Sequence, residues 1–391
     1  LENYGAPAKV AEARLGTQFV QFCVEPSIIK KGRGQTKRTS PRKIAALSMD
    51  LALVLAVGQV KVVPSVPDRT RVVGIEAPLP IRADVTLREV IISEAFAKCR
   101  GHLRLPLGEK KTGEASVFDL HTMPHLLIGG TTDSGKSICA HAMIAGLLFQ
   151  NSPDTLRLLL IDPDAVEFKR YNSIPHLLKS VITDPSRAIP ALQEVSQEME
   201  ARHKRFVGVG ASDIQDFNQQ ASQSDTMTPM PRIVVVIEWL RDLIERTAGG
   251  AEDILSGLAQ RGHKMGIHLI LITQRPSADA ISPSLKANIP ARIAMKAASA
   301  SESRLILDEA GAERLSSPGD MLFKPPEFEH PLRLQAPHVH DKELERLITY
   351  WHDVAKPSPA HTRTLPKFDD TEEISQFKDP LLPNAVEVLI A

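Results

Sequence analysis

The chain has 391 residues, of which 42% are hydrophobic, 24% are charged and 4% are aromatic, and its 47 basic residues balance its 47 acidic residues. This composition is ordinary for a globular protein, and the length gives room for two domains. The zero net charge excludes bulk charge as a reason to bind nucleic acid, so such binding would need a local basic surface, and the few aromatic residues disfavour recognition of single strands by base stacking.

The apolar runs and the cysteines narrow the class of protein further. The longest apolar stretch, around residues 49–57, contains Asp50 and is too short to span a bilayer, and no secretory signal is present. Cys23, Cys99 and Cys139 lie far apart without the spacing of a metal or redox motif. We therefore expect structural thiols in a reducing compartment, which is the cytoplasm.

The first hundred residues mix short strand-like runs with one amphipathic helix. Over Pro41–Val57, apolar residues recur at helical spacing, among them Ile44, Leu47 and Leu51. This pattern predicts a small α/β domain over residues 1–100. The segment 30–43, just before and at the start of that helix, carries seven basic residues and no acidic one. It could touch phosphates, but its composition favours a solvated loop.

From His125 onward, apolar strands alternate with helices, which predicts a mainly parallel sheet covered on both faces. The predicted helices are Pro190–Phe206 and Ala251–Lys264, with a long polar loop over residues 208–231 between helix and strand. These elements form a second predicted domain over residues 101–354. The predicted strands are His125–Gly129, Thr155–Asp162, Arg232–Glu238, Ile267–Thr273 and Ala291–Ala297.

The end of the chain changes character. Residues 355–379 are rich in proline and charge, which predicts a linker, and residues 380–391 are apolar and helix-like, as if a further domain began there. The chain also begins without methionine, so we expect it to be a segment of a longer protein.

The strand His125–Gly129 runs directly into G-x-x-x-x-G-K-S, the pattern of a phosphate-binding P-loop followed by a helix. Glycines let the backbone curl so that its N–H groups and the helix N-terminus face phosphate oxygens. Lys136 is then expected to reach the β- and γ-phosphates of ATP, and the Ser137 hydroxyl to bind Mg²⁺. Asp133 is unusual, since it places a carboxylate beside the phosphates. The predicted nucleotide-binding residues are Gly130, Thr131, Thr132, Asp133, Ser134, Gly135, Lys136 and Ser137.

A P-loop ATPase also needs a carboxylate at the end of a neighbouring strand, to serve the magnesium ion. We favour Glu238 because the strand before it is the more purely apolar one, and we name it with Lys136 as catalytic. Asp162 competes for the metal role, and Glu167 follows it closely. Gln274, the third residue that we name as catalytic, ends a further strand, where its side chain could sense the γ-phosphate. The alternative for Gln274 is an ordinary polar strand end.

These segments together resemble one family, the hexameric DNA translocases of the FtsK/SpoIIIE type. The P-loop segment 125–137 is similar to HLLIAGATGSGKS of that family, and segment 161–167 is similar to its IDPKxxE. Segments 266–277, 286–290 and 319–322 are close to verbatim matches. The resemblance covers almost the whole chain.

The resemblance implies a RecA-like P-loop core preceded by the small α subdomain, with residues 380–391 starting a truncated winged-helix module. It implies a ring of six subunits around double-stranded DNA, with ATP at each subunit interface. Arg275 and Lys286 match basic positions of loops that face DNA, while their alternative is a surface salt bridge. If membrane spans precede the segment in the parent protein, the motor would lie at the inner face of a bacterial membrane.

The departures from the family pattern concern hydrolysis. Trp239 stands where the family has its catalytic glutamate, and loss of a general base typically costs about 10²–10⁴-fold in rate. Arg261 or Lys264 could act in trans on a neighbour's ATP, although the segment around them is altered. Three hypotheses follow: an ATP-driven DNA translocase, as in chromosome segregation at cell division; a degenerate member that binds ATP and oligomerises without efficient hydrolysis; and a polypeptide-secretion ATPase.

Overall fold

The computed structural model describes residues 1–15, 19–31, 35–57, 60–64, 66, 71–78, 85–274, 282–315 and 318–355. The chain divides into two compact units. The first contains residues 1–85 and 109–115, and the second contains residues 86–108 and the chain from 116 onward. The predicted linker and the predicted terminal module lie outside the described residues, except for Ala355, which ends the last helix.

The first unit is a four-stranded antiparallel sheet in the order β1-β2-β6-β5, a separate hairpin β3-β4 and two short helices. Its core gathers Val24, Ile44, Val73 and Ile75. In the basic segment 30–43, predicted as a solvated loop, residues 30–31 and 35–38 instead lie in the strands of the hairpin, and residues 41–43 begin α1. The elements of the unit are η1 Glu2–Tyr4, β1 Ala8–Leu15, β2 Phe19–Pro26, β3 Ile28–Lys31, β4 Gln35–Arg38, α1 Pro41–Ala46, α2 Ser48–Val54, β5 Lys61–Val63 and β6 Val73–Pro78.

The single helix predicted over Pro41–Val57 is wrong, because the structure has two helices. Leu47 leaves the helical conformation, with φ −91° and ψ 12°. The apolar residues on the two sides of this turn differ in burial. Ile44 of α1 is buried, whereas Leu53 and Val54 of α2 are 81% and 67% exposed. A count of apolar spacing does not detect such a turn, because the hydrophobic residues continue through it.

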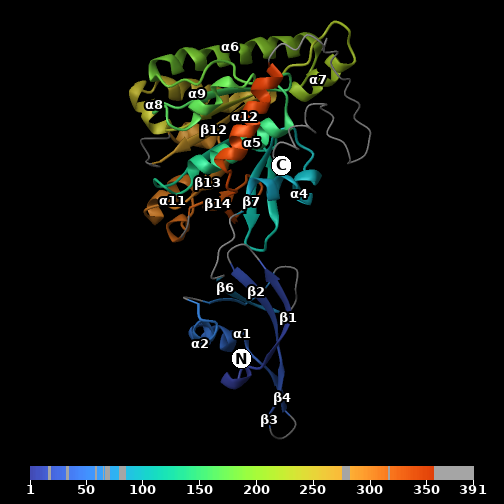
Figure 1. Cartoon of the computed structure of the whole chain (residues 1–391), viewed down its shortest axis with the longest axis vertical. Coiled ribbons are helices and arrows are strands. Elements are labelled where there is room, and N and C mark those ends of the chain that lie inside the picture. Colours follow the sequence, from blue (N-terminus) through green and yellow to red (C-terminus); the bar gives the residue numbers. More distant parts are fainter. Residues whose placement is uncertain are drawn as a thin grey trace. The chain divides into compact units, whose positions relative to one another are not determined.

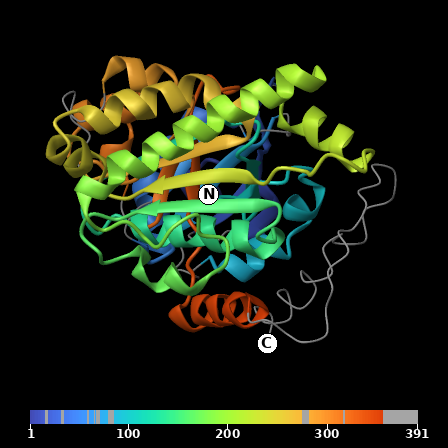
Figure 2. The same cartoon turned by 90° about the horizontal axis from the view of Figure 1, so that it is seen from above.

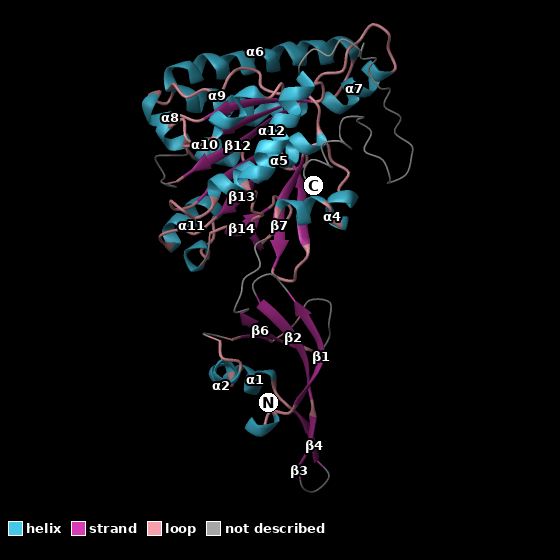
Figure 3. Ribbon diagram, viewed as in Figure 1, coloured by secondary structure: helices cyan, strands magenta, loops and turns pink. Residues whose placement is uncertain are grey.

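The second unit holds a nine-stranded sheet with helices on both faces (Figures 1 and 3), although residues 109–110 and 115, at the ends of two of its strands, are assigned to the first unit. Its elements are α3 Leu87–Ile91, α4 Glu94–Lys98, β7 Arg104–Lys110, β8 Ala115–Asp119, β9 His125–Gly129, α5 Lys136–Gln150, β10 Leu156–Ile161, η2 Phe168–Ser173, α6 Pro185–Val209, α7 Ile214–Ser222, β11 Arg232–Ile237, α8 Leu240–Arg246, α9 Gly250–Arg261, η3 Gly262–Met265, β12 Ile267–Thr273, α10 Pro283–Ala287, β13 Ala291–Ala294, α11 Ala300–Leu307, η4 Ala312–Arg314, β14 Asp320–Lys324, β15 Leu332–Gln335 and α12 Asp341–Ala355.

The sheet follows the order β10-β11-β12-β9-β13-β14-β15-β7-β8. The five strands predicted from the sequence form its parallel part: β10, β11, β12, β9 and β13 pair in parallel, while β13-β14 and β14-β15 are antiparallel. The predicted α/β class with a mainly parallel P-loop core is therefore confirmed. Since parallel strands end at one edge, the residues that follow β9, β10, β11 and β12 meet there.

Side chains that alternate along these strands pack into two separate apolar layers, one on each face of the sheet. Leu126, Ile128 and Val234 pack on the side of α5 and α12. Leu127 and Val235 pack on the side of α6, α8 and α9. Figure 2 shows the two layers of helices on opposite faces of the sheet, with α6 on one side and α12 on the other. Burial on both faces explains why the strands read as continuous apolar runs.

Two boundaries differ from the sequence prediction. Residues 86–100 fall within the second unit, because Leu87, Ile91 and Phe96 of α3 and α4 are buried in its core. The loop predicted over residues 208–231 contains the helix α7. Asp213 caps this helix by accepting hydrogen bonds from the N–H groups of Gln215 and Asp216, each at 2.9 Å. In the described part of the chain, no helix is long and apolar enough to cross a membrane.

Several histidines are buried in the uncharged form in the second unit. His125 and His268 are inaccessible to solvent. The His125 Nδ1 atom accepts a hydrogen bond from the Leu269 N–H at 3.1 Å, so its other nitrogen carries the proton. Burial lowers the pKa of His125 to about 3 and the pKa of His176 to about 4, and it lowers the pKa of His268 well below the ordinary value.

These lowered pKa values predict acid destabilisation above the range in which carboxylates titrate. Below a pH of about 6.5, the pKa of a histidine in the unfolded chain, the unfolded chain takes up protons that the folded chain does not bind. The free energy of unfolding therefore falls by up to about 1.4 kcal/mol per pH unit for each such histidine. Urea denaturation between pH 6.5 and pH 5 measures this slope. His125→Asn should reduce the slope by about one proton. An identical slope in the variant and the parent protein would contradict the assignment.

Candidate functional site

The predicted P-loop connects the carboxyl end of β9 to the first residue of α5. Gly130, Asp133 and Gly135 adopt positive φ angles of 159°, 59° and 99°, which curl the backbone between strand and helix. The Thr131 N–H donates to the carbonyl of Lys296 at 2.8 Å, so the loop is anchored to the segment that follows β13. The predicted loop conformation is therefore present.

A second anchor comes from the start of β14. The Gly319 N–H donates to the carbonyl of Ser134 at 2.8 Å. The two backbones approach so closely that a Cβ atom on Gly135 would lie 2.6 Å from the nitrogen of Gly319. Gly135 is thus required twice, by its positive φ angle and by this contact.

Lys136 and Glu238 are two buried ionisable groups at the loop, one basic and one acidic. The Lys136 ammonium donates to the Thr131 carbonyl at 2.6 Å, and its side chain is almost inaccessible. Burial lowers the pKa of Lys136, while the nearby carboxylates of Glu238 and Asp133 oppose that shift. Asp133, itself a residue of the loop, therefore lies near the cationic group of Lys136.

Glu238 follows β11 and is inaccessible to solvent. Its Oε1 atom accepts a hydrogen bond from the Ser137 hydroxyl at 3.4 Å, and its Oε2 atom is buried without a partner among the described residues. Burial raises the pKa of Glu238, and the neighbouring Glu167 carboxylate adds to this effect. A hydroxyl beside a buried oxygen with unused acceptor capacity is a donor set that suits Mg²⁺.

The two other carboxylates lie after β10, and the Oδ1 atom of Asp162, like Oε2 of Glu238, is buried without a partner among the described residues. The Asp162 Oδ2 atom accepts hydrogen bonds from the N–H groups of Glu167 and Phe168 at 2.8 and 3.0 Å, so Asp162 shapes the turn after β10. The Glu167 Oε2 atom lies 3.2 Å from Nε2 of His141, whose Nδ1 lies 2.9 Å from the Tyr171 hydroxyl. Sequence reasoning missed His141 and Tyr171, although His141 lies four residues after Ser137 on the P-loop helix, where both face the same side.

Gln274 lies where the sequence places it, immediately after β12 at the edge of the P-loop. Thr273 of β12 pairs with Gly129 of β9, and the Thr132 hydroxyl donates to Oε1 of Gln274 at 3.1 Å. The structure thus brings Gln274 to the loop.

Trp239 follows Glu238 and precedes α8. It adopts a left-handed conformation, with φ 58° and ψ 44°, which is uncommon for a bulky residue. Its indole N–H is buried without a partner among the described residues. Position 239 therefore offers a donor, and no proton acceptor, at the end of β11.

The predicted basic residues that precede β12 and β13 in the described chain lie apart from the loop. Arg261 and Lys264 precede β12, at the sheet edge opposite the P-loop, and Arg261 pairs with Glu200 at 2.5 Å. The Lys286 ammonium lies 2.8 Å from Asp308, whose carboxylate also contacts Arg292. Arg275 lies outside the described residues.

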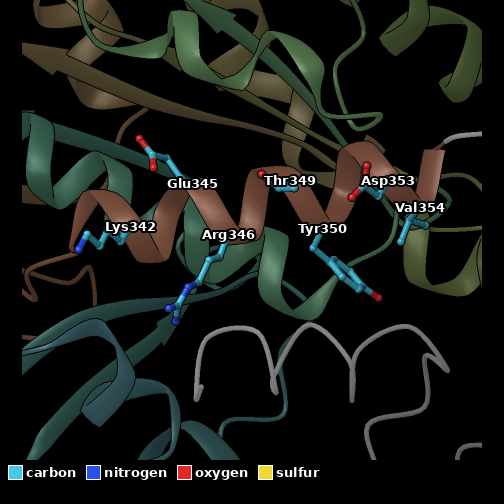
Figure 4. Close-up of a pocket in the computed structure, with 7 residues that line it drawn as sticks. All are labelled: Lys342, Glu345, Arg346, Thr349, Tyr350, Asp353 and Val354. Carbon is cyan, nitrogen blue, oxygen red and sulfur yellow. The ribbon is translucent and has the colours of Figure 1, made fainter.

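Two other places in the structure are weaker candidates for a functional site. The rings of His338 and His340 stack edge to face at 4.7 Å, and the described residues contain no group of three ligands that could hold a metal. A shallow depression along α12, lined by Lys342, Arg346 and Tyr350 among others, contains none of the P-loop residues (Figure 4).

Comparison with known proteins identifies two segments. Residues 86–278 match the sequence profile of the FtsK/SpoIIIE family, and residues 1–79 match that of the FtsK alpha domain. The chain is 39% identical over 353 residues to the DNA translocase FtsK of Streptococcus pneumoniae, which covers 89% of this chain and 45% of that protein. It is 36% identical over 394 residues to the DNA translocase SpoIIIE of Bacillus subtilis, with 48% of that protein covered. The chain thus spans about half the length of these relatives.

Two solved structures share the fold. The conjugation coupling protein TcpA of pCW3, determined with ATPγS, superposes with a TM-score of 0.61 at 21% identity, covering 88% of this chain and 93% of that one. The cytoplasmic domain of the type VII secretion ATPase EccC of Thermomonospora curvata superposes with a TM-score of 0.60 at 24% identity, covering 73% and 36%. At these identities the superpositions establish the fold alone.

The contact between Gly135 and Gly319 predicts the effect of adding one methyl group. Gly135→Ala should destabilise the protein by about 1–3 kcal/mol, because it combines an unfavourable φ angle with a backbone clash, and it should weaken ATPγS binding. Urea denaturation and calorimetric titration measure the two effects.

Gly257→Ala is the matched control. Gly257 lies inside α9 and has open space around it, so the alanine should stabilise the protein by up to about 1 kcal/mol and leave ATPγS binding unchanged. Equal behaviour of the two variants would refute the proposed constraint on the loop.

Proposed function

Because this chain belongs to the FtsK/SpoIIIE family of P-loop ATPases, we propose that it is the motor segment of an ATP-driven translocase of double-stranded DNA. The observation that supports ATP use most directly is the pair formed by Ser137 and the buried Glu238 beside the P-loop lysine. Both relatives described above are named DNA translocases.

In this proposal, residues 130–137 bind the triphosphate through backbone N–H groups and the start of α5. Lys136 leaves the Thr131 carbonyl to contact the β- and γ-phosphates, and Gln274 detects the γ-phosphate from the next strand. Ser137 and Glu238 hold Mg²⁺, which would neutralise charge on the phosphates. The unpartnered Glu238 oxygen supports this assignment.

Lys286 and Arg275 are the residues that we propose for contact with DNA phosphates, a contact independent of sequence. In the structure Lys286 is held by Asp308, so DNA would have to compete with that carboxylate. We further propose a ring of six subunits. Arg261 and Lys264 could then act only on a neighbour's nucleotide, because they lie at the opposite sheet edge from their own P-loop.

One observation favours a second candidate function, a ring that binds ATP without efficient hydrolysis. Trp239 occupies the position of the family's catalytic glutamate, and an indole cannot accept a proton from water. Under this alternative the nucleotide would serve assembly of the ring rather than movement along DNA.

The variant Lys136→Ala tests whether the protein hydrolyses ATP at the P-loop. The parent protein should show ATPase activity stimulated by double-stranded DNA, and the variant should lose it by at least about 10²-fold, because the charge that contacts the phosphates is gone. Steady-state phosphate release with and without DNA is the measurement. A parent protein without turnover, combined with turnover in Trp239→Glu, would establish the alternative function instead.

A second pair of variants tests the DNA contact. Lys286→Ala should weaken binding to double-stranded DNA and reduce the salt slope of log K by about 1. Asp308→Asn should strengthen binding, because it removes the carboxylate that competes with phosphate. Fluorescence anisotropy over a range of salt concentrations measures both. If Lys286 serves only the fold, its substitution will change stability and leave DNA affinity intact.

A further inference from the structure

A carboxylate from a different strand lies beside the P-loop helix. Glu167 follows β10, the strand next to β11, and the Glu238 N–H donates to the carbonyl of Ile161 at 2.9 Å. The turn after β10 therefore begins level with Glu238. Asp162 fixes that turn by accepting the N–H of Glu167 itself at 2.8 Å. The backbone that carries Glu167 is thus held at the nucleotide edge of the sheet.

The Glu167 side chain faces the same hydroxyl as Glu238. The Ser137 hydroxyl donates its one proton to Glu238 at 3.4 Å, and it also lies close enough to Glu167 to contribute to the lowered pKa of that carboxylate. The two carboxylates differ in exposure: Glu238 is inaccessible, whereas the side chain of Glu167 is 30% exposed. The inaccessible Glu238 therefore suits a buried metal ion, whereas the partly exposed Glu167 can be reached by water.

A buried chain of hydrogen bonds orients Glu167. The Tyr171 hydroxyl, which is inaccessible to solvent, lies 2.9 Å from Nδ1 of His141. In a neutral imidazole, an Nε2 atom that donates to the carboxylate at 3.2 Å leaves Nδ1 to accept from Tyr171. Support of this kind restricts a side chain to one orientation, which is what a group that positions water requires.

We propose that Glu167 is the catalytic carboxylate of this site, accepting a hydrogen bond from the water that attacks ATP, with His141 and Tyr171 as positioning residues. The proposal rests on the ATPase function proposed above. It explains how the site could act although residue 239 is a tryptophan. The water oxygen bonds to the γ-phosphorus while the bond to the β,γ-bridging oxygen breaks. The electron pair leaves with ADP, and the water proton passes through the Glu167 carboxylate to an oxygen of the released phosphate.

Turnover of Glu167→Gln, compared with the exposed Glu345→Gln on α12, tests the proposal. Glu167→Gln should lower kcat by about 10²–10⁴-fold with the KM for ATP within about threefold, because the amide keeps the shape of the side chain and loses the proton acceptor. Glu167→Asp should retain more activity than the amide. The control should match the parent protein. A Glu167→Gln variant that retains more than about a third of kcat would overturn the proposal.

The positioning residues are tested by comparing the effects of substitution on kcat and on KM. Tyr171→Phe removes the hydroxyl that is hydrogen-bonded to His141. It should therefore lower kcat by about tenfold and leave KM unchanged. A variant in which KM rises and kcat stays constant would place Tyr171 in binding rather than in the orientation of Glu167.

A binding measurement decides the case in which the parent protein does not hydrolyse ATP, which is the failure of the proposed function. Calorimetric titration with Mg²⁺ compares ADP alone with ADP plus aluminium fluoride, which mimics the phosphoryl group in transfer. Glu167→Gln should bind ADP normally and should bind the aluminium fluoride complex at least about tenfold more weakly. Equal affinity of both proteins for the complex would refute the role of Glu167 whether or not the parent protein is active.

Discussion

The site depends on the burial of a basic group and an acidic group at one edge of a parallel sheet. Lys136 and Glu238 are both removed from water, and burial opposes the charge of each. Such a pair is costly unless hydrogen bonds and further charges complete it. The Thr131 carbonyl accepts a hydrogen bond from Lys136, and the Ser137 hydroxyl donates one to Glu238. A triphosphate and a divalent cation would supply the rest, which is a physical reason for this arrangement of residues to be a nucleotide site.

The P-loop and the parallel strands could be predicted from the sequence because they depend on local patterns. Short apolar runs and fixed glycine spacing are visible without knowledge of the fold. The break at Leu47 and the helix α7 were missed, because the first hides within an apolar run and the second within a polar one. Both are small, local departures, and neither changes the architecture.

The surroundings of Glu167 could not be predicted for a different reason. Its partners His141 and Tyr171 come from the P-loop helix and from η2, and only the packing of these elements brings them together. The same holds for Lys286, whose partner Asp308 lies beyond the following strand and helix. Motif matching places a residue in a segment, but the charge that the residue meets is set by the fold. Residue roles taken from a resemblance therefore depend on contacts that the sequence does not contain.

The anchors of the P-loop have a consequence for how the pocket forms. Thr131 is bound to Lys296, 165 residues later in the chain, and Ser134 is bound to Gly319. Contacts between such distant residues form late in folding, because the intervening chain must lose its freedom first. During synthesis from the N-terminus, the loop would emerge long before the two strands that brace it. The competent nucleotide pocket is therefore a product of completed folding, and nucleotide binding could report that the whole second unit has closed around its sheet.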